Sequence, residues 1–452
     1  MKLTFCGASH EVTGSCYHLE TTQANVVVDC GLFQGSEFSD DKNFKVWPFK
    51  PSEVKAVMIT HAHFDHVGRL PKLVKDGFSG PIYATPATAD LARLVIEDAF
   101  RIMAYEHEKF QRPLLYTDAD VNRAVSLFEA VDYNKKVTVA PGVEATWHDA
   151  GHIFGAAFIV VEAEGKRVAF SGDIGNINVP ILRETEALPA VDALLVESTY
   201  GDREHEGADK RTAMLQKLLE EAAEKGGTIM VPAFSIERTQ EFLYSLHRMQ
   251  EHGTGLPKIP IYLDSPLAID ATKVYKKYPQ YYDTEAAAEL MAGDDFLNFP
   301  QLHVTYSREE SKTINNVRGA KMVIAGAGMM NGGRILHHAM RYLPDPNSTL
   351  LIVGYQAYGT LGRRLYEGAK WAKIHGEDIP VRCSIKAIGA LSAHGDQKKM
   401  LQWVGSGPGG AAPKTIFCIH GEAHAATELA HRIRDQYGVM PEVPEYGEVV
   451  TI

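Results

Sequence analysis

The segment His61-Ala62-His63-Phe64-Asp65-His66 places four metal-competent side chains within six residues. It follows directly on an apolar run that is typical of a buried β-strand. Side chains alternate along an extended segment, so His61 and His63 point to one side, whereas Asp65 and His66 come where the chain turns into a helix. A single zinc ion takes only three or four ligands. A fold that brings a few distant residues to this loop could therefore hold two zinc ions.

Three further metal-competent residues, His152, Asp173 and His420, each end a β-rich run later in the chain. Asp173 follows the second of two predicted strands, residues 157–161 and 167–170, which flank a turn. Strand ends are where a rigid scaffold presents ligands. Any one of these residues alone is more often structural than a ligand, but their occurrence together with the histidine loop favours a metal site.

On these residues the chain resembles the metallo-β-lactamase superfamily. Three more segments resemble the motifs of its β-CASP branch, which processes nucleic acids: Val196-Glu197-Ser198-Thr199-Tyr200-Gly201, Leu391-Ser392-Ala393-His394-Gly395-Asp396 and His420-Gly421-Glu422. Within the branch, the chain most resembles bacterial and archaeal homologues of the endonuclease subunit of the cleavage and polyadenylation specificity factor. Ribonuclease J is a more distant relative. The resemblance covers nearly the whole chain.

The resemblance implies two Zn²⁺ ions as cofactors, and a donor set of imidazoles with a few carboxylates suits zinc better than Mg²⁺. One ion would be bound by His61, His63 and His152. The other would be bound by Asp65, His66 and His420. Asp173 would bridge the two.

The resemblance also implies the catalytic residues His394, Glu197 and Asp65. His394 would lie near the leaving oxygen and donate a proton to it, which general acid catalysis requires. Glu197 would hold the imidazole and favour its protonated form. Asp29 ends a strand, and we expect it to orient the histidine loop by hydrogen bonds without touching metal.

Contacts to the phosphates of a substrate are predicted for Ser392 and Arg238, because hydroxyl groups and the arginine fork suit phosphate. Arg363 and Arg364 fit the same role and fit a solvated helix face equally well. Glu237 stands where many members of the resembled family carry glycine, which puts the start of the following helix in question.

The order of predicted strands and helices divides the chain into three parts. Residues 1–207 alternate strands with helices, including a helix expected from Thr117 to Val131, and predict sheets flanked by helices. Residues 208–377 alternate strand and helix and predict a parallel sheet. Residues 378–452 return to strands. We therefore predict an α/β protein, with a metallo-β-lactamase αββα sandwich into which a parallel-sheet β-CASP domain is inserted.

Composition and net charge limit which partners the chain can bind and which cellular compartment suits it. The net charge of −11 argues against a broad nonspecific surface for nucleic acid, although a local basic groove is compatible with it. No apolar stretch approaches the ~18 residues that span a bilayer, so no membrane contact is expected. The start lacks the features of a signal peptide, and five scattered cysteines without a CxxC pair suit a reducing cytoplasm. The sequence does not decide between a monomer and a homodimer.

The sequence thus predicts a zinc-dependent ribonuclease that hydrolyses phosphodiester bonds of single-stranded RNA by a two-metal hydroxide mechanism. A metallo-hydrolase of a small substrate is a rival, but a large inserted domain argues against it. A DNA nuclease is another, and DNA-acting members of the resembled branch usually lack the histidine matched by His420. An inactive scaffold subunit would have lost ligands, and none is lost here. Whether cutting is endo- or exonucleolytic is left open.

Overall fold

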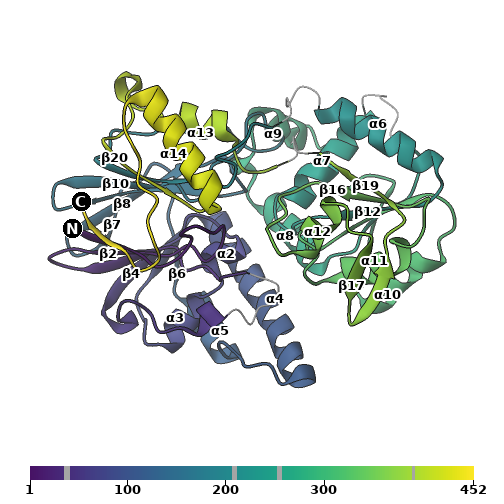
Figure 1. Ribbon diagram of the computed structural model, residues 1–452, viewed down its shortest axis with the longest axis horizontal. Coiled ribbons are helices and arrows are strands. Elements are labelled where there is room, and N and C mark those ends of the chain that lie inside the picture. The colour runs from purple at the N-terminus through teal and green to yellow at the C-terminus, as the bar shows by residue number, and fades with distance from the viewer. Residues whose placement is uncertain (35–40, 206–210, 252–256, 389–391) are drawn as a thin grey trace. The chain divides into compact units, whose positions relative to one another are not determined.

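The computed structural model describes residues 1–34, 41–205, 211–251, 257–388 and 392–452. They form two compact units, which Figure 1 draws with their elements labelled. The first unit comprises Met1–Ile177, Leu182–Glu204 and His394–Ile452. The second comprises Asn178–Ile181 and His205–Ala393.

The first unit contains two sheets. The larger has the order β21-β1-β2-β3-β4-β5-β6, with the bounds Val449–Thr451, Lys2–Phe5, Tyr17–Glu20, Asn25–Val28, Val54–Met58, Ile82–Ala84 and Phe128–Ala130. The smaller has the order β20-β11-β10-β9-β8-β7, with the bounds Thr415–Ile419, Ala193–Glu197, Lys166–Phe170, Ala157–Ala163, Val143–Asp149 and Val137–Ala140.

The core of this unit lies between the two sheets. Leu3 and Val26 of the larger sheet belong to the same buried cluster as Trp147 and Phe170 of the smaller one. Helices lie on the outer faces (Figure 1). Beside the larger sheet are α3, α4 and α5, with the bounds Leu70–Lys75, Pro86–Phe110 and Asp118–Ser126; beside the smaller are α13 and α14, with the bounds Gln397–Val404 and Ala423–Tyr437. The short helices α1 and α2 span Asp41–Phe44 and Phe64–Val67.

Strand direction brings distant parts of the chain to one edge of the smaller sheet. β10, β11 and β20 are mutually parallel neighbours. β9 runs antiparallel to both β8 and β10, so β8 points the same way as β10. The carboxyl ends of these four strands therefore meet at the same edge, although they are spread over residues 149 to 419.

The second unit is built on a parallel sheet of order β14-β13-β15-β12-β16-β19, with the bounds Leu302–Val304, Ile261–Leu263, Lys321–Ala325, Thr228–Pro232, Thr349–Ile352 and Ser384–Ala387. Its helices α6 to α12 have the bounds Arg211–Glu224, Arg238–Glu251, Pro266–Lys277, Thr284–Met291, Arg308–Thr313, Arg334–Tyr342 and Leu361–Tyr366. A hairpin of β17 (Trp371–Ile374) and β18 (Glu377–Pro380) completes it. The predicted α/β fold with a parallel sheet in its second part is confirmed.

One element ends differently from the prediction. The helix expected to reach Val131 stops at Ser126, because Phe128 begins a strand that pairs with Ile82 of β5. Its predicted start, a capping box of Thr117 and Asp120, is present. The second unit includes β19, which pairs with β16 in its sheet, and extends to Ala393.

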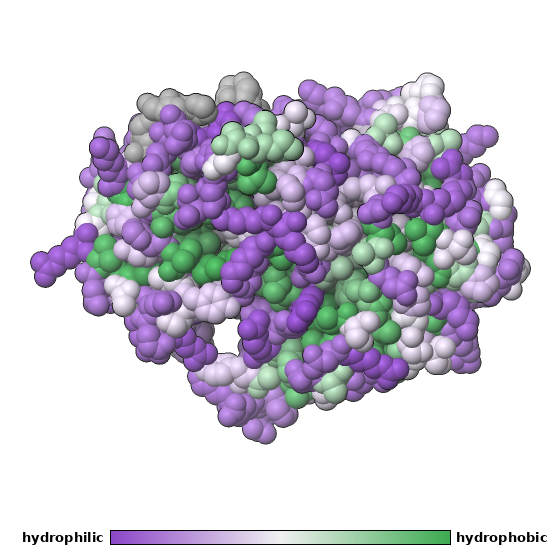
Figure 2. All heavy atoms as spheres, turned by 180° about the vertical axis from the view of Figure 1, so that it is seen from behind, coloured by the Kyte–Doolittle hydropathy of each residue, from purple (hydrophilic) through white to green (hydrophobic). Residues whose placement is uncertain are grey.

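Polar side chains cover most of the face seen in Figure 2, with hydrophobic residues between them. Within the described residues, no helix combines the length and the apolar character needed to cross a membrane. All five cysteines are buried and free.

We expect Trp147→Ala to destabilise the first unit strongly. The Trp147 side chain is fully buried, and its indole N–H donates to the Ile59 carbonyl at 3.1 Å, just before the histidine loop. The change leaves a cavity and an unpaired carbonyl, which should cost about 3–5 kcal/mol of unfolding free energy. The urea midpoint followed by circular dichroism should fall, whereas it should barely move for Phe110→Ala at an exposed site. Equal midpoints for both variants would contradict this.

Candidate metal centre

The metal-competent residues predicted from the sequence lie at the ends of strands in the first unit. The histidine loop follows β4, and His152 follows β8 after a two-residue connection. Asp173 comes three residues after β10, and His420 follows β20 directly. Because these strands belong to both sheets, the site is anchored on two sides by the core.

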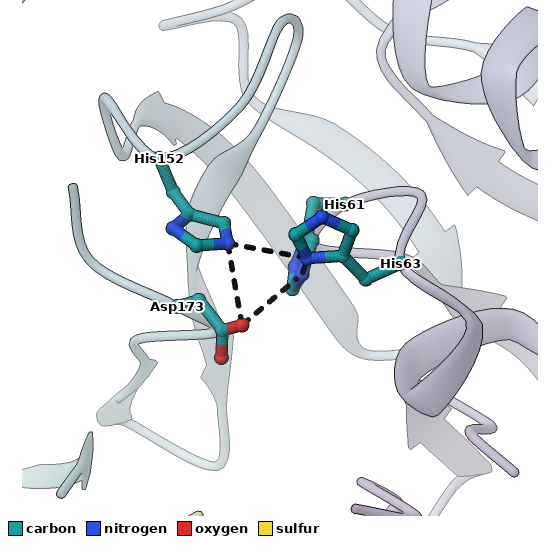
Figure 3. Close-up of side chains that lie close together, drawn as sticks. All are labelled: His61, His63, His152 and Asp173. Carbon is teal, nitrogen blue, oxygen red and sulfur yellow. Dashed lines mark hydrogen bonds and ion pairs between the residues drawn. The ribbon is translucent and has the colours of Figure 1, made fainter. Parts of the chain in front are cut away.

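One group of side chains is His61, His63, His152 and Asp173 (Figure 3). The Nδ1 atom of His63 lies 3.1 Å from His61 Nε2 and 3.2 Å from His152 Nε2. The Oδ2 atom of Asp173 lies 3.3 Å and 3.4 Å from the same two nitrogens. All four donor atoms therefore point toward one small volume.

A second group is Asp65, His66 and His420, and Asp173 also reaches it. His420 Nε2 lies 3.3 Å from both His66 Nε2 and Asp65 Oδ2. The other oxygen of Asp173, Oδ1, lies 3.3 Å from His66 Nε2 and 3.7 Å from His420 Nε2. The carboxylate of Asp173 thus lies between the two groups, with one oxygen facing each.

The donor atoms of both groups fit metal ions. A tetrahedral zinc ion with ligand bonds of about 2.0–2.1 Å has ligand atoms about 3.3–3.4 Å apart, which is close to the separations observed. The contacts within the cluster leave Asp173 Oδ1 buried without a hydrogen-bond partner in the described structure, as a metal ligand would be when its ion is absent. Imidazoles and carboxylates are also the donor types that zinc prefers.

The imidazoles differ in charge because their surroundings differ. Burial lowers the pKa of His61 to about 3 and that of His63 to about 4, and it lowers the pKa of His152 as well. These three rings are neutral near pH 7, in the form that binds metal. Burial also acts to lower the pKa of His66 and His420. The carboxylates of Asp173 and Asp29 together outweigh it at His66, and those of Asp173 and Asp65 outweigh it at His420, so the pKa of both rings is raised.

Asp29 contacts the histidine loop and belongs to neither group of donors. Its carboxylate accepts hydrogen bonds from the Thr60 N–H at 2.8 Å and the Thr60 hydroxyl at 2.8 Å, and it lies 2.7 Å from His66 Nδ1. Asp29 is fully buried with a positive φ of 57° at the end of β3. This contact to Nδ1 leaves Nε2 of His66 to face the donor group.

His394 and Glu197 form a pair beside these groups. The Nδ1 atom of His394 lies 3.2 Å from both carboxylate oxygens of Glu197 and 3.9 Å from Asp173 Oδ2. Burial opposes the charge of His394, but Glu197 and Asp173 outweigh it and raise the pKa of the ring to about 9. A β-bridge to Gly175 and the hydrogen bond of Ile174 N–H to Glu197 Oε1 fix the pair in place.

Thr199 orients a donor and was not singled out from the sequence. Its hydroxyl lies 3.1 Å from His420 Nδ1 and 3.1 Å from the His420 carbonyl oxygen. His420 has a positive φ of 49°, so its backbone conformation needs such support. The feature of the sequence that could have pointed to Thr199 is the pair of hydroxyl residues that follows Glu197.

The predicted phosphate contacts lie in the second unit. Arg238 begins α7 and is buried, with its guanidinium paired to Glu241, and Ser392 is buried as well. Arg363 pairs with Glu367 at 2.6 Å on α12, as a solvated helix face would, whereas no ion pair is found for Arg364 among the described residues. Glu237 has a left-handed φ of 68°, a conformation that favours glycine, and it accepts a hydrogen bond from the Tyr275 hydroxyl at 2.6 Å.

Comparisons with known proteins agree with this geometry. The family model described as the metallo-beta-lactamase superfamily matches residues 11–229, and that of the Beta-Casp domain matches residues 239–365. The model of the Zn-dependent metallo-hydrolase RNA specificity domain matches residues 378–444. The chain is 38% identical over 452 residues to "Ribonuclease TTHA0252" of Thermus thermophilus, with 100% of both chains covered. The chain belongs to the metallo-β-lactamase superfamily.

Two more distant similarities are consistent with this membership. The chain is 30% identical over 469 residues to "Transcription termination factor FttA" of Methanothermobacter thermautotrophicus, with 100% of the chain and 72% of that protein covered. A solved structure described as a protein of unknown function from Enterococcus faecalis V583 shares the fold, with a TM-score of 0.55 at 12% identity and 100% and 99% coverage. This metallo-β-lactamase superfamily chain therefore has an αββα sandwich and a β-CASP domain.

We expect Asp29→Ala to weaken metal binding while every predicted donor stays in place. Removing the carboxylate leaves the Thr60 N–H without its acceptor and His66 Nδ1 without its partner. Loss of a group that orients a metal-binding histidine typically lowers metal affinity about 10–100-fold. Competition with a chromogenic zinc chelator measures this. Asp132→Ala, at an exposed carboxylate, is the matched control and should leave the affinity unchanged. An Asp29→Ala protein with parental zinc affinity would refute the role.

Proposed function

We propose that this chain is a zinc-dependent ribonuclease that hydrolyses phosphodiester bonds of single-stranded RNA. The observation that carries the proposal is the pair of donor groups that share the Asp173 carboxylate, with the His394–Glu197 pair beside them. The similarity to a named ribonuclease over the whole chain and the match to the RNA specificity domain support RNA as substrate. Cytoplasmic location is part of the proposal, supported by five free cysteines.

Two zinc ions are the proposed cofactors. One would be held by His61, His63 and His152, the other by Asp65, His66 and His420, with Asp173 between them. When bound, a zinc pair lowers the pKa of a water to produce hydroxide near pH 7 and stabilises the oxygens of an in-line displacement. Asp65 would take part in this chemistry as a ligand next to the reacting phosphate.

The proposed proton donor is His394. Its Nδ1 atom is held by the Glu197 carboxylate, so Nε2 is the nitrogen that would give its proton to the leaving oxygen of the RNA. The negative charge of Glu197 keeps the imidazole protonated near pH 7. Glu197 therefore positions and charges the acid without donating a proton itself.

The function is tested on matched RNA and DNA oligomers of one sequence. We expect the purified protein to cut 5′-labelled and 3′-labelled RNA, to cut the DNA far less, and to stop when a chelator is added. The comparison belongs at one stated low salt concentration, because phosphate binding weakens with salt. Product sizes from the two labels distinguish endo- from exonucleolytic cutting. Equal rates on DNA would favour a DNA nuclease, and rapid lactone turnover without RNA cleavage would favour a small-substrate hydrolase.

Substitution of His394 and of His420 separates the acid from the ligands. His394→Ala should retain zinc by elemental analysis but lose about 10²–10⁴-fold in RNA cleavage, because an alkoxide is a poor leaving group. It should largely spare bis(p-nitrophenyl) phosphate, whose nitrophenolate leaves without a proton. Glu197→Gln should show the same pattern more mildly.

His420→Ala is the contrasting variant. It should lower zinc content from about two ions per chain and slow both substrates, because it removes a ligand. Zinc loss in His394→Ala, or equal slowing of both substrates by it, would show that His394 is not the general acid.

A further inference from the structure

The second unit carries a groove that the donor groups and the catalytic pair do not use. The groove has a volume of about 350 Å³ and lies between the end of α12, the base of the β17–β18 hairpin and the strand β19, drawn in green in Figure 1. Its lining includes Tyr366, Lys370, Arg382, Ile385 and Lys386, and no lining residue carries a carboxylate. The groove is therefore a basic concavity.

The positive charges of the groove are not neutralised within the described structure. Lys370, Arg382 and Lys386 are exposed, and no salt bridge or side-chain hydrogen bond to a described residue is found for any of them. Lys225 approaches the start of β19, where it donates to the neutral Ser384 hydroxyl at 2.8 Å. Three unpaired cations around one groove contrast with the net charge of −11 of the whole chain. Such a site attracts an anion of several charges.

Two exposed aromatic side chains accompany these cations. Tyr366 lines the groove and is 57% exposed, and Trp371, the residue after Lys370, is 59% exposed. Large aromatic rings at that exposure, beside unpaired cations, form the kind of platform on which unstacked bases lie while cations hold the phosphates. The acidic residues Glu377 and Asp378 lie on β18 toward the tip of the hairpin, opposite Ile374 and Lys373. The charge at the base of the hairpin thus stays positive.

We propose that this groove binds single-stranded RNA, as a second contact for substrate away from the scissile phosphate. The proposal rests on the ribonuclease function proposed above and extends it to a separate surface of the chain. Lys370, Arg382 and Lys386 contact phosphates, and Tyr366 stacks on a base. The contact is independent of sequence, because every base offers a ring face.

Charge favours RNA over the other occupants of such a groove. β19 is the edge strand of its sheet, so a peptide strand or a second copy of this chain could pair with it. A second copy carries a net charge of −11 but would bring its own three unpaired cations to a symmetric contact. An RNA strand brings one negative charge per nucleotide to three cations for which no partner is found among the described residues. It also uses the aromatic rings, which a backbone-paired strand does not need.

The test is the triple variant Lys370→Ala/Arg382→Ala/Lys386→Ala, with binding of an unstructured RNA 30-mer measured by fluorescence anisotropy at several salt concentrations. Single strands contribute a slope of about −0.7 per phosphate contact to a plot of log affinity against log salt. Three lost contacts should therefore make the slope less steep by about 2, and affinity at low salt should fall at least about tenfold. The His394→Ala background keeps the RNA intact during the measurement.

The matched control is Lys217→Ala/Lys258→Ala/Arg318→Ala, which removes the same charge from exposed residues of the same unit that do not line the groove. It should change the slope much less. Tyr366→Ala should weaken binding about fivefold or more without changing the slope, because it removes stacking and no charge. In the His394→Ala background, the groove variants should leave zinc content and bis(p-nitrophenyl) phosphate hydrolysis unaltered.

The outcomes separate the two proposals. If the unsubstituted protein neither binds nor cleaves RNA, the ribonuclease function fails, and the groove proposal fails with it. If it cleaves RNA and the groove variant matches the control in affinity and slope, only the groove proposal is overturned. A groove variant that keeps RNA affinity but changes from dimer to monomer in light scattering identifies an interface between copies, which also overturns it.

Discussion

The carboxylate of Asp173 is the point on which the arrangement of the site depends. One oxygen faces His61 and His152, and the other faces His66 and His420. The group is almost fully buried, and its pKa is held well below the usual range because the surrounding imidazoles outweigh burial. A buried charge of this kind is costly unless cations or hydrogen bonds compensate it. Both donor groups are therefore tied to one rigid position at the end of β10, and displacement of that strand would disturb them together.

The two sheets of the first unit supply this rigidity. Asp65 and His420 are 355 positions apart in the chain but lie 3.3 Å apart, because β4 and β20 end at the same side of one core. The donors do not hold themselves in place. Asp29 with Thr60 fixes His66, Thr199 fixes His420, and Glu197 fixes His394. Asp29, Glu197 and His420 thus lie at or next to strand ends, where a rigid scaffold limits movement, whereas Asp65 and His66 lie in α2 and His394 lies between β19 and α13.

Sequence reasoning located the strands more accurately than the ends of elements. The strands around the Glu164–Gly165 turn, the capped start of α5, and the parallel sheet of the second unit follow from local patterns. The end of α5 does not, because pairing of Phe128 with β5 overrides a helical pattern. Arg238 was expected at a phosphate, and its burial against Glu241 is a packing outcome with no local signal. By contrast, the sequence did point to unusual backbone at Glu237, where many members of the family carry glycine, and this residue has a left-handed conformation.

The sequence by itself determined which chemistry this chain can carry. The residue types and spacing of the histidine loop, with His152, Asp173 and His420, identify a zinc-type donor set, because ligand preference depends on the atoms that a side chain offers. Only the tertiary structure decided how those atoms are shared: which oxygen of Asp173 faces which histidines, which imidazoles are neutral, and that three cations of the second unit surround one groove. Distances between residues hundreds of positions apart, and the burial that shifts their pKa values, arise from packing of the whole chain and leave no trace in local sequence.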